Sequence, residues 1–109
     1  MKYYIATASG NREAALAAAT NFRSAGHRVV STWHDSPYDR KSESRVMPGI
    51  LRSIAEKCMQ EIDYCDCVLA LGHPDMRGAL WECGYAMGKG KRVYWGGSRE
   101  VSLFAWLSE

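Results

Sequence analysis

The chain has 109 residues and a net charge of +2, with 47% apolar and 24% charged residues, as expected for one soluble globular domain. The small charge gives no argument for a nucleic acid polymer as partner, and no apolar run is long enough to cross a membrane. The first residues lack the long apolar stretch of a signal peptide. We therefore expect a single cytoplasmic domain over residues 1–109.

The first part of the chain predicts a strand, a helix and a second strand. Residues 2–8 predict a buried strand, and apolar residues at helical spacing predict a helix over about 12–25 that ends at Gly26. A short strand is expected at about 28–33. The polar stretch 34–47 predicts a long loop, and a loop of that length is usually functional or disordered.

The middle of the chain predicts a second helix and a central strand. Pro48 suits the first position of a helix that runs to about Tyr64. Residues 67–71 are all apolar, which is typical of a parallel strand buried on both faces. The apolar stripe of the predicted helix consists of Leu51, Ile54, Ala55, Cys58 and Ile62.

The last part predicts a third helix, a strand and a terminal helix. Gly78 opens the helix at 79–89, Gly90 ends it, and the last clear strand covers 92–95. A short helix is expected at 98–108, with Leu103, Phe104 and Trp106 as its apolar anchors.

Strands and helices alternate along the whole chain with mostly short links. This order predicts an α/β fold, a single-domain three-layer sandwich with a four- or five-stranded parallel sheet of the flavodoxin or Rossmann type. Ligands of such folds bind at the carboxyl ends of the strands. The segments at these ends are residues 9–12, 33–46, 72–78 and 96–100.

Several common site motifs are missing from the sequence. There is no G-x-G-x-x-G, no P-loop and no G-x-S-x-G, and the cysteine spacing fits no common zinc site. We expect reduced cysteines that pack as small hydrophobic residues, no metal and no other cofactor. Cys83 has no evident histidine partner that would make it a nucleophile.

Glu82 is the strongest single candidate for catalysis. It falls in the first turn of the predicted third helix, where the helix dipole favours an ionised carboxylate, the form that a nucleophile requires. The simpler explanation is that acidic residues stabilise helix starts, by about 0.3–1 kcal/mol.

The turn after the first strand is the second candidate. Ser9, Gly10 and Asn11 can present backbone N–H groups to an anion, and Arg12 can add a charged fork. Alternatively, Ser9 or Asn11 only caps the following helix. Both interpretations are open at this point.

Aromatic residues near the strand ends form the third group of candidates. Tyr3 and Tyr4 point to opposite faces of their strand, so one belongs to the core and the other can reach the site. Trp33 and His34, followed by Asp35, can stack on and bind a flat ring. A core tryptophan at the start of a loop is the simpler interpretation and is slightly preferred.

Three stretches together resemble a known enzyme family. The residues RGALWECGYAMGKGKRVYW (77–95), ILRSIAEKCMQEIDYCDCVLAL (50–71) and MKYYIATASGNRE (1–13) are similar to the nucleoside 2-deoxyribosyltransferase superfamily, including its deoxynucleoside 5′-monophosphate N-hydrolase branch. The resemblance covers nearly the whole chain.

The resemblance implies cleavage of an N-glycosidic bond, with hydrolysis favoured over base exchange. Glu82 matches the nucleophile that forms a glycosyl-enzyme ester, and Tyr3 matches the strand tyrosine beside the sugar. Residues 9–12 match the 5′-phosphate loop, and Gly78 lies in the glycine-rich turn. The family's active sites form at subunit interfaces, which implies a homodimer or larger assembly.

One position departs from the family pattern. The aspartate expected in the second helix is replaced by Cys58, and Asp75, in the loop before the third helix, is the expected second carboxylate. The alternative function is a non-catalytic nucleotide-binding or sensor domain, which the presence of Cys58 favours and that of Glu82 disfavours.

Overall fold

The computed structural model describes residues 1–35 and 48–109, so most of the loop predicted at 34–47 lies outside the described residues. Four parallel strands form one sheet in the order β2-β1-β3-β4. Their bounds are β1 Lys2–Ala6, β2 Arg28–Val29, β3 Cys67–Leu71 and β4 Arg92–Gly96. The predicted α/β fold with a parallel sheet, of the Rossmann-like type, is confirmed. In folds with this strand order, ligands usually bind at the carboxyl ends of the strands, near β1 and β3, where the direction of winding changes.

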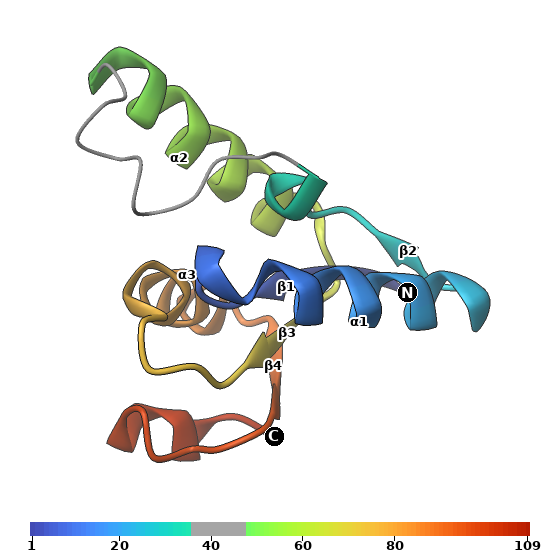
Figure 1. Cartoon of the computed structure of the whole chain (residues 1–109), viewed down its shortest axis with the longest axis vertical. Helices are drawn as coiled ribbons and strands as arrows, with labels where there is room; N and C mark the ends of the chain where they lie inside the picture. The colour runs from blue at the N-terminus through green and yellow to red at the C-terminus, as the bar shows by residue number, and fades with distance from the viewer. Residues whose placement is uncertain (36–47) are drawn as a thin grey trace.

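Helices cover both faces of the sheet (Figure 1). Helix α1 (Arg12–Ser24) packs on one face, where Ile5, Ala15 and Ala19 are buried. Helices α2 (Pro48–Tyr64) and α3 (Arg77–Gly88) lie on the other face. The larger core cluster on that side includes Tyr4, Ala6, Ile62, Val68, Met76, Ala79, Cys83, Ala86 and Val93.

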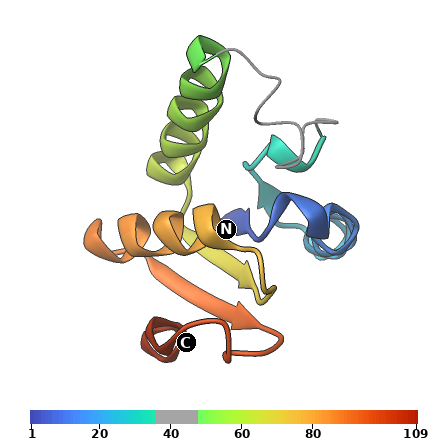
Figure 2. The ribbon, with the colours of Figure 1, turned by 60° about the vertical axis from the view of Figure 1, so that its left-hand side comes forward.

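Two helices end as predicted, at glycines with positive φ. Gly26 has φ of 87° and Gly90 has φ of 77°, a backbone conformation that other residues rarely adopt. Helix α2 has the predicted bounds, but only Ile62 of its apolar stripe is buried. Its amino-terminal half extends away from the sheet, as Figure 2 shows. No helix of the described ranges is both long enough and apolar enough to span a lipid bilayer.

Strand β2 is shorter than the predicted strand at 28–33. Val30 still donates its N–H to the Tyr3 carbonyl at 2.8 Å, but side chains then replace the backbone ladder. The Ile5 N–H donates to Ser31 Oγ at 3.1 Å, and Trp33 Nε1 donates to the Ile5 carbonyl at 2.7 Å. Both backbone polar groups of Ile5 therefore have partners without a longer ladder, and the 3₁₀ segment η2 (Trp33–Asp35) follows.

The terminal helix predicted at 98–108 is instead the short 3₁₀ helix η4 (Leu103–Leu107). The predicted anchors were wrong, because Leu103, Phe104 and Trp106 are 75%, 64% and 70% exposed, whereas Ala105 is buried. Backbone hydrogen bonds fix the end of the chain: Trp95 N–H donates to the Glu109 carbonyl at 3.0 Å, and Glu109 N–H to the Val93 carbonyl at 2.8 Å. The segment therefore needs no large apolar side chain to hold it.

Gly72 is the position where a small change should disturb the carboxyl edge of the sheet most. A Cβ atom on this residue would fall against the backbone carbonyl oxygen of Ser98, which cannot move as a side-chain tip can. We expect Gly72→Ala to lower the free energy of unfolding by about 1–3 kcal/mol, measured by urea denaturation. Gly84→Ala, where the added Cβ meets open space, is the control and should not destabilise. Equal stability of Gly72→Ala and the wild type would contradict the close approach.

Candidate active site

The site is centred on a hydrogen bond between β1 and α3. The Tyr4 hydroxyl donates a short hydrogen bond to Glu82 Oε2. Tyr4 is fully buried in the middle of β1, and Glu82 is partly buried in α3. The buried phenol therefore fixes the orientation of a carboxylate at the border of the core.

Burial controls the ionisation of both groups. It raises the pKa of Glu82 to about 7; the Tyr4 hydrogen bond opposes this rise and the charge of Glu61 adds to it. Burial also raises the pKa of Tyr4 far above its usual range, so Tyr4 stays a neutral donor. Helix α3 begins at Arg77, which places Glu82 in the second turn. The expectation of a first-turn carboxylate, held ionised by the helix dipole, is therefore wrong.

The tyrosine at Glu82 is Tyr4 and not Tyr3. The side chain of Tyr3 lies on the opposite face of β1 and stacks on Phe22 of α1, with ring centroids 4.2 Å apart. The two tyrosines do point to opposite faces, as predicted, but the tyrosine that contacts Glu82 is Tyr4 and not Tyr3. Because side chains alternate along a strand, an error of one residue moves the assignment to the other face of the sheet.

Helix α2 contributes a thiol and a second carboxylate. Cys58 lies beside the Tyr4 hydroxyl, and burial raises the pKa of its thiol to about 11, so it stays protonated. Glu61 accepts hydrogen bonds from Thr32 N at 3.2 Å and Thr32 Oγ1 at 2.6 Å. The charge of Glu61 raises the pKa of Glu82. The predicted second carboxylate was Asp75, which is exposed in the loop before α3. Sequence reasoning missed Glu61, since only the fold brings its charge near enough to act on the pKa of Glu82.

The turn after β1 holds the second group of predicted site residues. Ser9, Gly10 and Asn11 form the 3₁₀ turn η1 (Ser9–Asn11), and α1 follows directly. Asn11 makes no capping bond; its side-chain amide donates to Thr7 Oγ1 at 3.1 Å. Thr7 Oγ1 in turn donates to the Leu71 carbonyl at 2.7 Å, which joins the ends of β1 and β3. The capping interpretation thus fails for Asn11.

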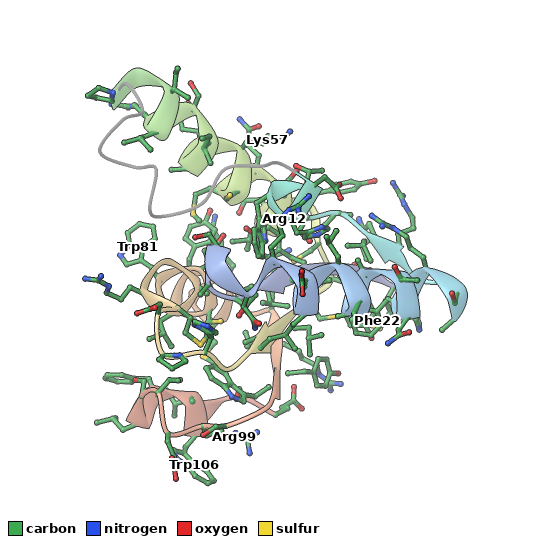
Figure 3. All side chains as sticks on the ribbon, in the orientation of Figure 1. Arg12, Phe22, Lys57, Trp81, Arg99 and Trp106 are labelled. Carbon is green, nitrogen blue, oxygen red and sulfur yellow. The ribbon has the colours of Figure 1, made fainter. Side chains whose placement is uncertain are left out.

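Arg12 connects the turn to the 3₁₀ segment η2. Its Nε donates to the His34 carbonyl oxygen at 2.6 Å, so the base of the guanidinium is fixed (Figure 3). Gly78 is exposed in the first turn of α3, with open space where a Cβ would be.

Trp33 and His34 belong to the body of the protein. The indole of Trp33 is tied to β1 through Ile5, and His34 has no exposed surface. The structure agrees with the preferred interpretation, a core tryptophan at the start of a loop. It does not agree with a stacking role for His34, because this side chain is fully buried. His34 Nε2 lies 2.9 Å from Ser31 Oγ, and His34 Nδ1 lies 3.4 Å from Asp35 Oδ1. This Ser–His–Asp arrangement is reminiscent of a hydrolase triad. Ser31 is fully buried and accepts a hydrogen bond from the sheet, so this array serves the fold.

The cysteines are unpaired, and Cys65, Cys67 and Cys83 are buried, as predicted for thiols that pack as hydrophobic residues. Within residues 1–35 and 48–109, no three or more histidine, cysteine or acidic side chains are grouped so as to hold a metal ion.

The arrangement supplies one carboxylate that can change its charge near neutral pH and a neutral phenol that orients it. A polar turn with an arginine follows β1 at its carboxyl end. A carboxylate held in this way is suited to nucleophilic or acid–base chemistry. Comparison with models of known protein families, with curated proteins and with solved structures found no match to the chain.

Proposed function

We propose that the protein is an N-glycosidase that cleaves a nucleoside 5′-monophosphate or nucleoside, with Glu82 as nucleophile. The observation that carries the proposal is the hydrogen bond from Tyr4 to Glu82, which holds a carboxylate in place between β1 and α3 of a parallel-sheet fold. A retaining glycosidase needs such an oriented carboxylate. The resemblance to the nucleoside 2-deoxyribosyltransferase superfamily supports the same assignment.

The reaction would proceed in two displacements. Tyr4 holds the Glu82 carboxylate through Oε2, so Oε1 would attack C1′ of the sugar. The C1′–N bond breaks as the ester forms, and its electron pair leaves with the base, which takes a proton from water. A water molecule then attacks C1′, which frees Glu82 and releases the sugar with retained configuration.

The polar turn supports a substrate that carries a 5′-phosphate. Helix α1 begins at this turn without a side-chain cap from Asn11, and Arg12 stands at its first residue. Backbone N–H groups at a helix start and an arginine are common phosphate ligands. Hydrolysis is favoured over base transfer, and the implied homodimer with sites at the subunit interface stays a prediction.

A panel of nucleosides and their 5′-monophosphates, incubated with and without a free acceptor base, tests the proposal by chromatography of the released base. Release without acceptor is expected. Release only in the presence of acceptor would identify a transferase. No release in either case would reject the N-glycosidase.

The alternative is a nucleotide-binding domain without activity, and Cys58 favours it. A neutral thiol beside Tyr4 replaces the carboxylate that the family carries at this position, and a thiol cannot reproduce its hydrogen bonds. Thermal stabilisation by a nucleotide, together with no base release, would support this alternative.

Arg12 should determine the preference for phosphorylated substrates. We expect Arg12→Ala to raise KM for a 5′-monophosphate about 10–100-fold, which matches the loss of a charge-assisted pair, and to change KM for the nucleoside much less. Arg28→Ala is the matched control, since Arg28 contacts Tyr64 at the opposite end of the sheet. An equal rise in KM for both substrates would remove Arg12 from the phosphate site.

A further inference from the structure

Glu61 is a second acidic side chain from the helices that cover the Tyr4 face of the sheet. Its two carboxylate oxygens have separate donors: Oε1 accepts from Thr32 N at 3.2 Å and Oε2 accepts from Thr32 Oγ1 at 2.6 Å. Thr32 follows the carboxyl end of β2, and Glu61 belongs to the last turn of α2. The fold therefore fixes this carboxylate on the side of the sheet where ligands of such folds bind.

A short series of contacts links Glu61 to the Glu82 carboxylate. Cys58 precedes Glu61 by one helical turn, and residues with this spacing lie on the same face of a helix. On that face Cys58 lies beside the Tyr4 hydroxyl, which donates to Glu82. Helix α2 packs against both β1 and α3, the elements that carry Tyr4 and Glu82. The charge of Glu61 is accordingly near enough to raise the pKa of Glu82.

No cation neutralises Glu61 within the part of the chain that the structure describes, residues 1–35 and 48–109. The ion pairs found there do not include Glu61. Its donors, the amide and the hydroxyl of Thr32, are neutral, so they orient the carboxylate without cancelling its charge. Glu61 is also partly buried, and water screens such a charge less than it screens a charge on the surface.

We propose that Glu61 stabilises the positive charge that develops on the sugar as the bond from C1′ to the base breaks, an inference that rests on the proposed function. Before the reaction, the like charges of Glu61 and Glu82 repel each other. In the transition state the sugar ring becomes positive, and Glu82 gives part of its negative charge to the new bond. Repulsion is then replaced by attraction, and an interaction that is stronger in the transition state accelerates the reaction.

Substitution can separate the charge of Glu61 from its hydrogen bonds. Glu61→Gln removes the charge, and glutamine can still accept from Thr32. Thr32→Val removes the hydroxyl donor and keeps the charge. Glu56→Gln is the matched control, because it removes an exposed charge of the same helix, which is paired with Arg52. These variants distinguish an electrostatic role of Glu61 from a purely structural one.

Binding of two sugar phosphate analogues tests the proposal without turnover. One is a pyrrolidine, whose ring nitrogen is protonated at about pH 8, and the other is the neutral tetrahydrofuran of the same shape. Isothermal titration calorimetry should show that the wild type prefers the cation. We expect Glu61→Gln to lower this preference about 10–100-fold, as for the loss of one partly screened charge pair. Thr32→Val should keep most of the preference, and Glu56→Gln should keep all of it.

Base release by the same variants gives a second readout. Above the pH at which Glu82 is ionised, Glu61→Gln should lower kcat/KM about 10–100-fold. An unchanged cation preference in Glu61→Gln, an equal loss in Thr32→Val, or a wild type that binds neither analogue would overturn the role of Glu61. Base release that does not depend on Glu61 would reject this role and keep the N-glycosidase. A cation preference that depends on Glu61, without base release, would support the role and reject the N-glycosidase.

Discussion

Replacing Glu82 by glutamine should lower base release at least about a thousandfold and, at neutral pH, make the folded protein more stable. The loss of activity is expected because an amide cannot form the glycosyl ester. The gain in stability is expected because the fold holds an ionisable group where burial disfavours its charge.

The direction of the stability change follows from the pKa of Glu82. Its pKa rises from an ordinary value of 4.5 to about 7 in the folded protein. Between these values the folded state keeps its proton longer than the unfolded state does, so stability falls as pH rises. A pKa difference of this size corresponds to roughly 3 to 4 kcal/mol of stability, lost progressively as the pH rises from about 4.5 to about 7. Glu82→Gln should remove this dependence.

Urea unfolding of the wild type and Glu82→Gln at about pH 4 and about pH 8 measures the effect. The variant should be more stable only at the higher pH. Glu56→Gln is the control, because Glu56 is exposed on α2 in an ion pair with Arg52. Full activity of Glu82→Gln would contradict the role given to Glu82. The same would follow if Glu82→Gln and the wild type were equally stable at both pH values.

Replacing Tyr4 by phenylalanine should move the acidic limb of the pH–rate profile to higher pH. The nucleophile must be ionised, so kcat/KM should rise with pH through about 7 in the wild type. Tyr4 donates the hydrogen bond that lowers the pKa of Glu82, and its removal should shift the limb upward by about one pH unit. Activity at neutral pH should fall about tenfold or more as orientation is also lost.

Two further variants make this test specific. Tyr3→Phe removes the same hydroxyl group from the opposite face of β1 and should leave the limb in place. Glu61→Gln removes a charge that raises the pKa of Glu82, so it should move the limb to lower pH. The local structure should be kept, because glutamine can still accept the hydrogen bond from Thr32. If Tyr3→Phe and Tyr4→Phe had the same pH–rate profile, this result would contradict the assignment of Tyr4.

Local patterns were enough to predict most of the fold. The apolar run at 67–71 became β3 with these bounds, because a strand buried on both faces needs no alternation. Pro48 begins α2, and Gly26 and Gly90 have the positive φ that ends a helix. Each of these features depends on residues close in sequence.

Contacts between distant residues could not be predicted in the same way. Alternation placed Tyr3 and Tyr4 on opposite faces, but only the packing of α1 and α3 decides which tyrosine meets Glu82. Glu61 acts on the pKa of Glu82 from another helix, and Thr32, far away in sequence, holds the Glu61 carboxylate. The apolar residues of η4 were expected in the core, but backbone bonds to β4 secure this segment and leave them exposed.

The central claim is that Glu82 forms a covalent bond with the sugar. Mass spectrometry of the protein after rapid quenching tests it most directly, with a 5′-monophosphate whose 2′-fluorine slows breakdown of the ester. The proposal predicts a mass increase equal to the glycosyl phosphate on the peptide that contains Glu82, and none in Glu82→Gln. Base release by the wild type without this adduct, or with an adduct on another residue, would contradict it.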